Sequence, residues 1–382
     1  MLIIRGAGPD GRRLANSVTS MDNRDPAARN LQLDGLRGYA AVSVAVFHTI
    51  LGMDETLIPR IVYGRISDFS DAYSWFAKIV LKLFSGETAV LIFFVLSGTV
   101  LFQSLMRSKA PYPEVVVSFT VRRIFRIYPA LVVCLVFMML LAASSGRPVS
   151  FSDFAINACL FSFPMNGVTW TLNVEMVAVA FVLFGFLGWR AGGIAGLLAA
   201  SLFVWLIFRI PSLPIAVTFN SFWIYFILGM LIPTQVGAWV GQRLPTWSWP
   251  LILVMAIAFK GAVQQGAIAL LVTSLYYGRA GAFGQLLLLP ISQFLGRISY
   301  SFYLYNFVVL VYFFEAANQF GWLKSHPIEA GLFASLLTVS VTLPLAYASQ
   351  RWVEMPGIRL GRVLSTPSLR RGRLAKAAPE QS

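Results

Sequence analysis

Charged residues, cysteines and histidines are all scarce in this chain. Charged residues make up 12% of the 382 residues, whereas a soluble domain carries roughly 25%. There are two cysteines and two histidines in the whole sequence. Cys134 and Cys159 are expected at different depths of the fold, and no metal-ligand spacing is present. The sequence therefore predicts neither a disulfide framework nor a metal site.

Two further features are missing. Residues 1–30 have no apolar core of the kind found in a cleaved signal peptide, so we expect a flexible cytoplasmic tail there. A second, basic cytoplasmic tail is expected over residues 357–382. No internal repeat of roughly 20–50 residues is visible, which argues against a transporter built from repeats.

Apolar residues dominate what remains. The chain is 57% hydrophobic, with a mean hydropathy of +0.72. This composition predicts an all-α, polytopic membrane protein with one membrane domain over residues 31–356. About ten transmembrane helices are expected, at 38–52, 83–106, 127–145, 168–188, 192–210, 218–233, 249–260, 264–278, 298–316 and 328–352.

The net charge of +14 is distributed unevenly along the chain. Most Lys and Arg residues fall in segments that face the cytoplasm if the N-terminus does. Both termini are therefore expected in the cytoplasm, and the positive charge does not call for a nucleic-acid partner. Gly35 and Gly38, at the start of the first span, are expected to let another helix approach closely, and Asp34 is expected to cap that helix.

His48 is the residue that points most directly to chemistry. It lies inside the apolar first span, where an ionisable side chain is costly and usually functional. Imidazole is also the side chain best suited to moving a proton near neutral pH. Arg37 precedes it by roughly 16 Å of helix, about half the hydrocarbon thickness. The alternative is a core histidine bonded to a neighbouring helix.

A run of arginines precedes the third span. Arg123 and Arg126 share one helix face, and a guanidinium matches a phosphate with two hydrogen bonds. We therefore expect these two arginines, with Arg37, to bind an anion. Arg122 is as easily explained by anchoring at the cytoplasmic surface. Tyr128 follows at the entrance to the span and is included in the expected anion site.

The remaining polar candidates lie near the other spans. Glu175 could orient His48 or bind a substrate hydroxyl, and its alternative role is to pair with an arginine or a backbone amide. Five residues are expected at the substrate site, although Glu87 and Tyr300 could be interfacial anchors and Ser97 a packing residue. These five are Glu87, Ser97, Trp170, Asn173 and Tyr300.

Five motifs resemble those of the acyltransferase-3 family of bacterial integral-membrane acyltransferases. They occur in the family's order and cover about residues 31–356. The motifs are LDGLRG at 33–38 with His48, FFVLSG at 93–98, RRIFRIYP at 122–129, WTLNVE at 170–175 and LGRISYSFYL at 295–304.

The resemblance implies a ten-helix enzyme of the bacterial inner membrane that moves an acyl group, often acetyl, from acyl-CoA to a hydroxyl of a sugar or lipid-linked glycan. It implies that His48 is the essential histidine, that Arg37, Arg123 and Arg126 serve the donor, and that Glu175 is the carboxylate of the tryptophan motif. Many members carry a histidine where this chain has Asn306.

The expected function is therefore O-acylation with acyl-CoA as co-substrate and no metal. Membrane lipids surround the protein, and either a monomer or an oligomer fits the sequence. The alternative is a secondary transporter of a polar or anionic solute, in which His48 and Glu175 relay protons.

Overall fold

The computed structural model describes residues 30–64, 69, 71–210, 218–317 and 326–365. Every regular element in these ranges is a helix, which confirms the all-helical prediction. The principal helices are α2 (Leu31–Met53), α3 (Ala72–Leu83), α4 (Gly86–Met106), α5 (Tyr112–Ser144), α6 (Phe151–Ala158), α7 (Trp170–Phe208), α8 (Trp223–Leu231), α9 (Gln235–Arg243), α10 (Trp249–Ala258), α11 (Gly261–Tyr276), α12 (Gly281–Leu286), α13 (Pro290–Ala317), α14 (Pro327–Ser349) and α15 (Met355–Leu364).

The expected ten membrane spans are not confirmed. Within the described residues, six helices are long and apolar enough to cross a membrane, or seven if α8 and α9, bent by 76°, count as one span. A perpendicular span needs about 20 residues. The predicted spans at 218–233 and 249–260 contain the helices α8 and α10, which have 9 and 10 residues, and each alone is too short to cross a membrane. The count of ten is not confirmed, and the cytoplasmic placement of the termini stays a prediction.

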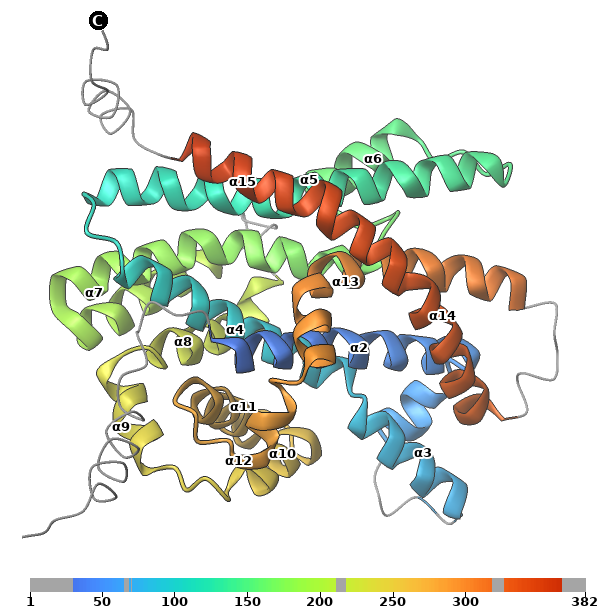
Figure 1. Ribbon diagram of the computed structural model, residues 1–382, viewed down its shortest axis with the longest axis horizontal. Helices are drawn as coiled ribbons and strands as arrows, with labels where there is room; N and C mark the ends of the chain where they lie inside the picture. The colour runs from blue at the N-terminus through green and yellow to red at the C-terminus, as the bar shows by residue number, and fades with distance from the viewer. Residues whose placement is uncertain (1–29, 65–68, 70, 211–217, 318–325, 366–382) are drawn as a thin grey trace, which may run out of the picture.

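Two of the predicted spans, 168–188 and 192–210, lie almost entirely within α7, which folds back on itself. Gly193 has φ +58° and ψ −137°, a conformation that glycine adopts without a steric penalty. A Cβ atom on Gly188 would lie 2.2 Å from the carbonyl oxygen of Gly196, so the residues on either side of the break are in contact. The two arms of this hairpin therefore pack against each other, as Figure 1 shows for the green helix.

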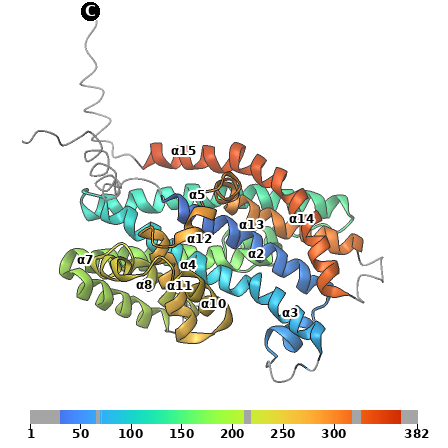
Figure 2. The same cartoon turned by 60° about the horizontal axis from the view of Figure 1, so that its bottom comes forward.

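Helix α2 lies in the middle of the bundle, packed on α4, α13 and α14 (Figures 1 and 2). A Cβ on Gly38 would lie 2.6 Å from the backbone nitrogen of Gly296, so the expected close approach of a second helix is confirmed. Near the other end of α2, Gly52 meets the Phe314 ring. Helices α2 and α13 therefore run parallel. The motif at 33–38 in α2 meets the motif at 295–304 in α13.

The start of α2 is fixed by a residue other than the expected one. The side chain of Asn30 accepts hydrogen bonds from the backbone N–H groups of Gln32 and Leu33, at 3.1 and 3.3 Å. This is the usual satisfaction of free N–H groups at a helix start. Asp34 lies inside the first turn and forms an ion pair with Arg37 at 3.0 Å. The prediction that Asp34 caps the helix was wrong.

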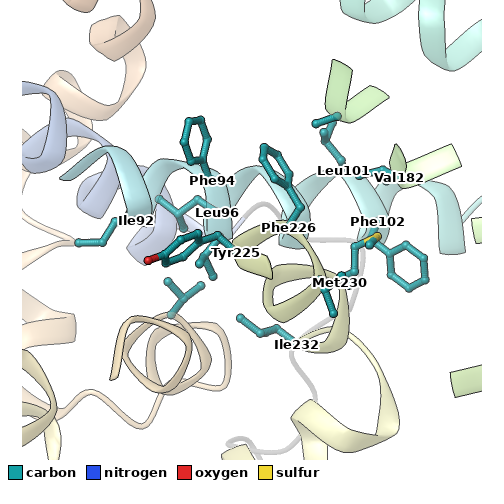
Figure 3. Close-up of a cluster of buried hydrophobic side chains, with 14 of the residues drawn as sticks. Ile92, Phe94, Leu96, Leu101, Phe102, Val182, Tyr225, Phe226, Met230 and Ile232 are labelled. Carbon is teal, nitrogen blue, oxygen red and sulfur yellow. The ribbon is translucent and has the colours of Figure 1, made fainter. Parts of the chain in front are cut away.

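Helix α4 packs on α8 through aromatic side chains, shown in Figure 3. Phe94 lies 5.3 Å from Phe226 between ring centroids and is fully buried with it. The backbones of Gly98 and Gly229 also meet, which brings the two helices close together. This packing fixes the face of α4 that carries Val90 and Ser97.

Helix α15 extends regular structure past residue 356, into the segment expected to be a tail. It lies against α5, where Gly357 meets the carbonyl of Phe125 and the ring of Pro129. A π-helical turn, Gln350–Glu354, joins it to α14. The other parts of the two predicted tails, residues 1–29 and 366–382, lie outside the described residues.

Candidate active site

Two neighbouring cavities hold most of the predicted site residues. The first, here called the arginine cleft, has a volume of about 70 Å³; the second, here called the histidine chamber, has about 630 Å³. The polar residues of the arginine cleft are Arg37, Ser97, Arg123, Arg126, Thr171, Glu175, Ser299, Tyr300 and Tyr303. The histidine chamber is lined by Phe47, His48, Gly86, Glu87, Val90, Leu91, Gly167, Val168, Trp170, Ser221, Phe222, Tyr225, Tyr303 and Phe307.

Glu175 is bound at both carboxylate oxygens inside the arginine cleft. Arg123 donates from Nη2 to Oε2 at 3.1 Å, and Ser97 donates from Oγ to Oε1 at 3.1 Å. Arg123 is buried, and a buried guanidinium is strongly destabilising unless it is paired. Glu175 is thus the partner of an arginine, which was its alternative role. No contact between Glu175 and His48 is found in the described part of the chain.

Arg126 lies one helical turn after Arg123 and lines the same cleft. Among the described residues, it has no hydrogen bond or ion pair to another side chain, and it is partly exposed. Arg37, which also lines the cleft, is paired with Asp34. The three guanidinium groups are close enough for Arg37 and Arg126 to repel the charge of Arg123. Of these three arginines, Arg126 is therefore the one without a carboxylate at ion-pair distance among the described residues.

Two residues expected at the anion site lie elsewhere. Arg122 is exposed, and its guanidinium donates to the backbone carbonyl of Ser118 on the same helix at 3.0 Å. Tyr128 packs against the apolar cluster around Leu131 and does not line the cleft. The helical period explains both positions, because residues one or two places from Arg123 or Arg126 point away from the face those two share.

Glu354 is a buried acid near the cleft that the sequence analysis missed. It lies in the π-helical turn, where Ser301 donates to its Oε2 at 3.0 Å. Its charge interacts with those of Arg126 and Arg37. Its signal in the sequence is weak, because Glu354 follows the polar residues Ser349, Gln350 and Arg351 and lies two residues beyond the predicted span 328–352.

His48 is oriented by its own helix. Its Nδ1 lies 2.8 Å from the carbonyl oxygen of Val44. A carbonyl can only accept a hydrogen bond, so Nδ1 carries the hydrogen and Nε2 of the neutral ring keeps its lone pair. Within the described residues, no protein group is bonded to Nε2, and the ring lines the histidine chamber. The alternative, a histidine bonded to a neighbouring helix, does not describe this ring.

The histidine chamber has mainly aromatic walls. The Phe47 ring lies 5.8 Å from the imidazole in an edge-to-face arrangement, and Trp170 packs on Phe222 with centroids 5.4 Å apart. Glu87 lines the chamber and forms an ion pair with Lys260. An apolar wall with a few polar groups is typical of a small-molecule site.

The five predicted substrate residues are divided between different places. Glu87 and Trp170 line the histidine chamber, whereas Ser97 and Tyr300 line the arginine cleft. Tyr300 also donates to the carbonyl of Ile127 at 2.6 Å, which ties α13 to α5. Asn173 is buried and lines neither cavity.

Two buried asparagines differ in whether the side-chain Nδ2 has a hydrogen-bond partner. Asn173 donates from Nδ2 to the carbonyl of Leu160 at 3.0 Å and so holds the segment before α7. Asn306, where relatives were expected to have histidine, has no hydrogen-bond partner for its Nδ2 in the described ranges. Asn173 is therefore structural, and Asn306 is a buried polar group without a role in either cavity lining.

Comparison with known proteins gives one match. A family model described as an acyltransferase domain matches residues 30–347, from the cap of α2 to the last turn of α14. No curated protein and no solved structure matches the chain. The matched residues include every residue that lines the two cavities, and Glu354 lies just beyond them.

Proposed function

The chain belongs to the acyltransferase-3 family, and from this premise we propose that it moves an acyl group from acyl-CoA to a hydroxyl of a sugar or lipid-linked glycan. Family and apolar helices together establish a multi-pass membrane acyltransferase. The donor, the acceptor and a location in a bacterial inner membrane are parts of the proposal.

In this proposal the phosphates of the donor bind at the outer edge of the arginine cleft, where Arg126 is partly exposed, and only the acyl end enters the cleft. Coenzyme A carries phosphates, and a guanidinium binds a phosphate through charge-assisted hydrogen bonds. Arg126 is the best placed of the three arginines, because Arg123 and Arg37 already have carboxylate partners. Those two contribute positive charge nearby, while Arg126 supplies the direct contact.

The acceptor hydroxyl reacts in the histidine chamber. Nε2 of His48 removes the hydroxyl proton as the oxygen attacks the thioester carbonyl, the carbon–sulfur bond breaks, and the leaving thiolate takes a proton to give coenzyme A. Alternatively, Nε2 attacks the thioester carbonyl first, the carbon–sulfur bond breaks and the coenzyme A thiolate leaves. The hydroxyl oxygen then attacks the acyl-imidazole, the carbon–nitrogen bond breaks, and the released hydroxyl proton ends on the thiolate. Both routes use the same nitrogen. The single observation that supports either is the Nδ1 bond to Val44, which leaves the Nε2 lone pair available.

The shape and lining of the chamber support a sugar acceptor. Its volume of about 630 Å³ is in the range of sites that enclose a small organic ligand. Trp170, Phe222 and Tyr225 offer aromatic faces, and the carbon-bound hydrogens of a sugar ring pack well on such faces.

The direct test is to follow the acyl group. The purified protein is placed in liposomes that contain glycolipids from the membrane of the cell that produces it. Acetyl-CoA radiolabelled in the acetyl group is then added. Label bound covalently to a glycolipid is the expected result, and a mass difference of one acyl group identifies the acceptor. Movement of label into the liposomes without any covalent product would instead favour the transporter and refute the proposal.

A further inference from the structure

The arginine cleft and the histidine chamber meet at one place. Two residues, Val90 on α4 and Tyr303 on α13, line both cavities. Every other lining residue of the described chain belongs to one cavity alone. Val90 and Tyr303 therefore form the partition between the donor arginines and the imidazole.

Tyr303 is held firmly in this partition. Its hydroxyl donates to the carbonyl of Val168 at 3.1 Å and accepts from Thr171 Oγ1 at 3.1 Å. Val168 lines the histidine chamber, whereas Thr171 lines the arginine cleft, so the hydroxyl lies at the boundary. The Phe93 ring packs edge-on against the tyrosine ring, with centroids 6.2 Å apart. Two hydrogen bonds and this ring contact fix the side chain in one position.

Val90, the other residue of the partition, lies on α4, a helix that is packed firmly in place. The side chain is 8% exposed, and the helix is packed on α8 through its aromatic and glycine contacts. Closely packed side chains of this kind do not deform freely, so this wall between the cavities is rigid.

We propose that Val90 and Tyr303 form the passage for the acyl group and set the longest acyl chain that the enzyme transfers. The inference rests on the proposed function, in which the thioester is held on the Arg126 side and reacts at His48 on the other. The acyl carbon must then cross the partition. The cleft next to it, at about 70 Å³, has room for only a few water molecules. An acetyl group fits such a space, and each added methylene group is disfavoured.

The test compares acetyl-CoA with butyryl-CoA as donors for the full-length protein in liposomes. The wild type is expected to prefer acetyl-CoA by at least about tenfold in kcat/KM, since one methylene group in a fitted pocket changes selectivity by about tenfold or more. Val90→Ala removes two methyl groups from the partition and should shift the ratio of the two kcat/KM values toward butyryl-CoA by about tenfold.

Val95→Ala is the matched control. Val95 is buried on the same helix and lines neither cavity, so the same substitution there should leave the ratio unchanged. Tyr303→Phe is a second, independent variant. It keeps the ring and removes the bonds to Val168 and Thr171, and it should also shift the ratio of the two kcat/KM values toward butyryl-CoA.

The outcomes separate this inference from the function on which it rests. Equal use of the two donors by the wild type, or identical ratios for Val90→Ala and Val95→Ala, would overturn the partition while acyl transfer itself stands. Failure of the wild type to transfer either acyl group would instead refute the proposed function, and the partition with it.

Discussion

The ion pair between Arg123 and Glu175 makes a sharp prediction about stability. Replacing Glu175 with Gln leaves the buried guanidinium without its carboxylate, and replacing Arg123 with Met leaves the carboxylate without its cation. The Arg123 side chain is 10% exposed and that of Glu175 is 22% exposed, so solvent screens neither charge well. Each single variant should therefore be clearly less stable than the wild type.

The magnitude follows from the cost of an unpaired buried charge. Breaking a buried pair by removing one partner typically costs about 3–5 kcal/mol. Glu175 borders a cleft and keeps its bond from Ser97, so the lower end, about 3 kcal/mol, applies to each single variant. The double variant removes both charges together, so its loss should fall short of the sum by about 2–3 kcal/mol.

The assay is a denaturation curve in detergent micelles for the wild type, the two single variants and the double variant. A matched control is Glu329→Gln, which removes a carboxylate that accepts a hydrogen bond from the exposed Tyr73 hydroxyl. The control should lose well under about 1 kcal/mol, as exposed interactions do.

Additive losses in the double variant would refute the pairing of Arg123 with Glu175. A second readout addresses the role of Glu175 in catalysis. Since this residue does not contact His48 in the described part of the structure, Glu175→Gln should transfer the acyl group with the same pH profile as the wild type. A shifted profile would restore the earlier expectation that Glu175 orients the imidazole.

Three further predictions concern other parts of the chain. Arg126→Ala should raise KM for acyl-CoA by about 10- to 100-fold and change kcat little, because it removes a hydrogen bond between charged groups. Arg122→Ala should leave both constants within about twofold of the wild type. Lys78 donates to the carbonyls of Ile61, Val62 and Gly64, so Lys78→Met should cost about 1–3 kcal/mol and speed proteolysis before α3, unlike Lys82→Met. Asn30→Ala should lower the free energy of unfolding by about 1 kcal/mol in the same denaturation assay.

The positions of most long helices could be predicted from the sequence, because apolar runs mark them directly. The predicted segments at 38–52, 83–106 and 298–316 lie within or close to α2, α4 and α13. Hydropathy could not show that α8 is a short helix bent away from α9, since bending depends on packing against other helices. It also could not show that α15 packs on α5, because that contact uses glycines rather than an apolar run.

The sequence predicted which residues line the site better than it predicted which side chains bind each other. Arg37, Arg123 and Arg126 do meet in one cleft, as expected, whereas Glu175 lies with them instead of beside His48. The partner of Glu175 was open, because a carboxylate on one helix can reach several neighbours and the sequence does not give their distances. The bond from His48 to its own backbone left no mark in the sequence, since every helical residue has a carbonyl four positions before it.

In the proposed reaction, Nε2 of His48 removes the proton of the acceptor hydroxyl or carries the acyl group. The most direct measurement is the initial rate of acyl transfer by His48→Gln, at equal amounts of protein in the membrane. His326→Gln is the matched control, because it is the same substitution at the other histidine, which is exposed. We expect a loss of about 10²- to 10⁴-fold or more for His48→Gln and a normal rate for His326→Gln. A rate for His48→Gln within about twofold of the wild type would contradict the proposed reaction.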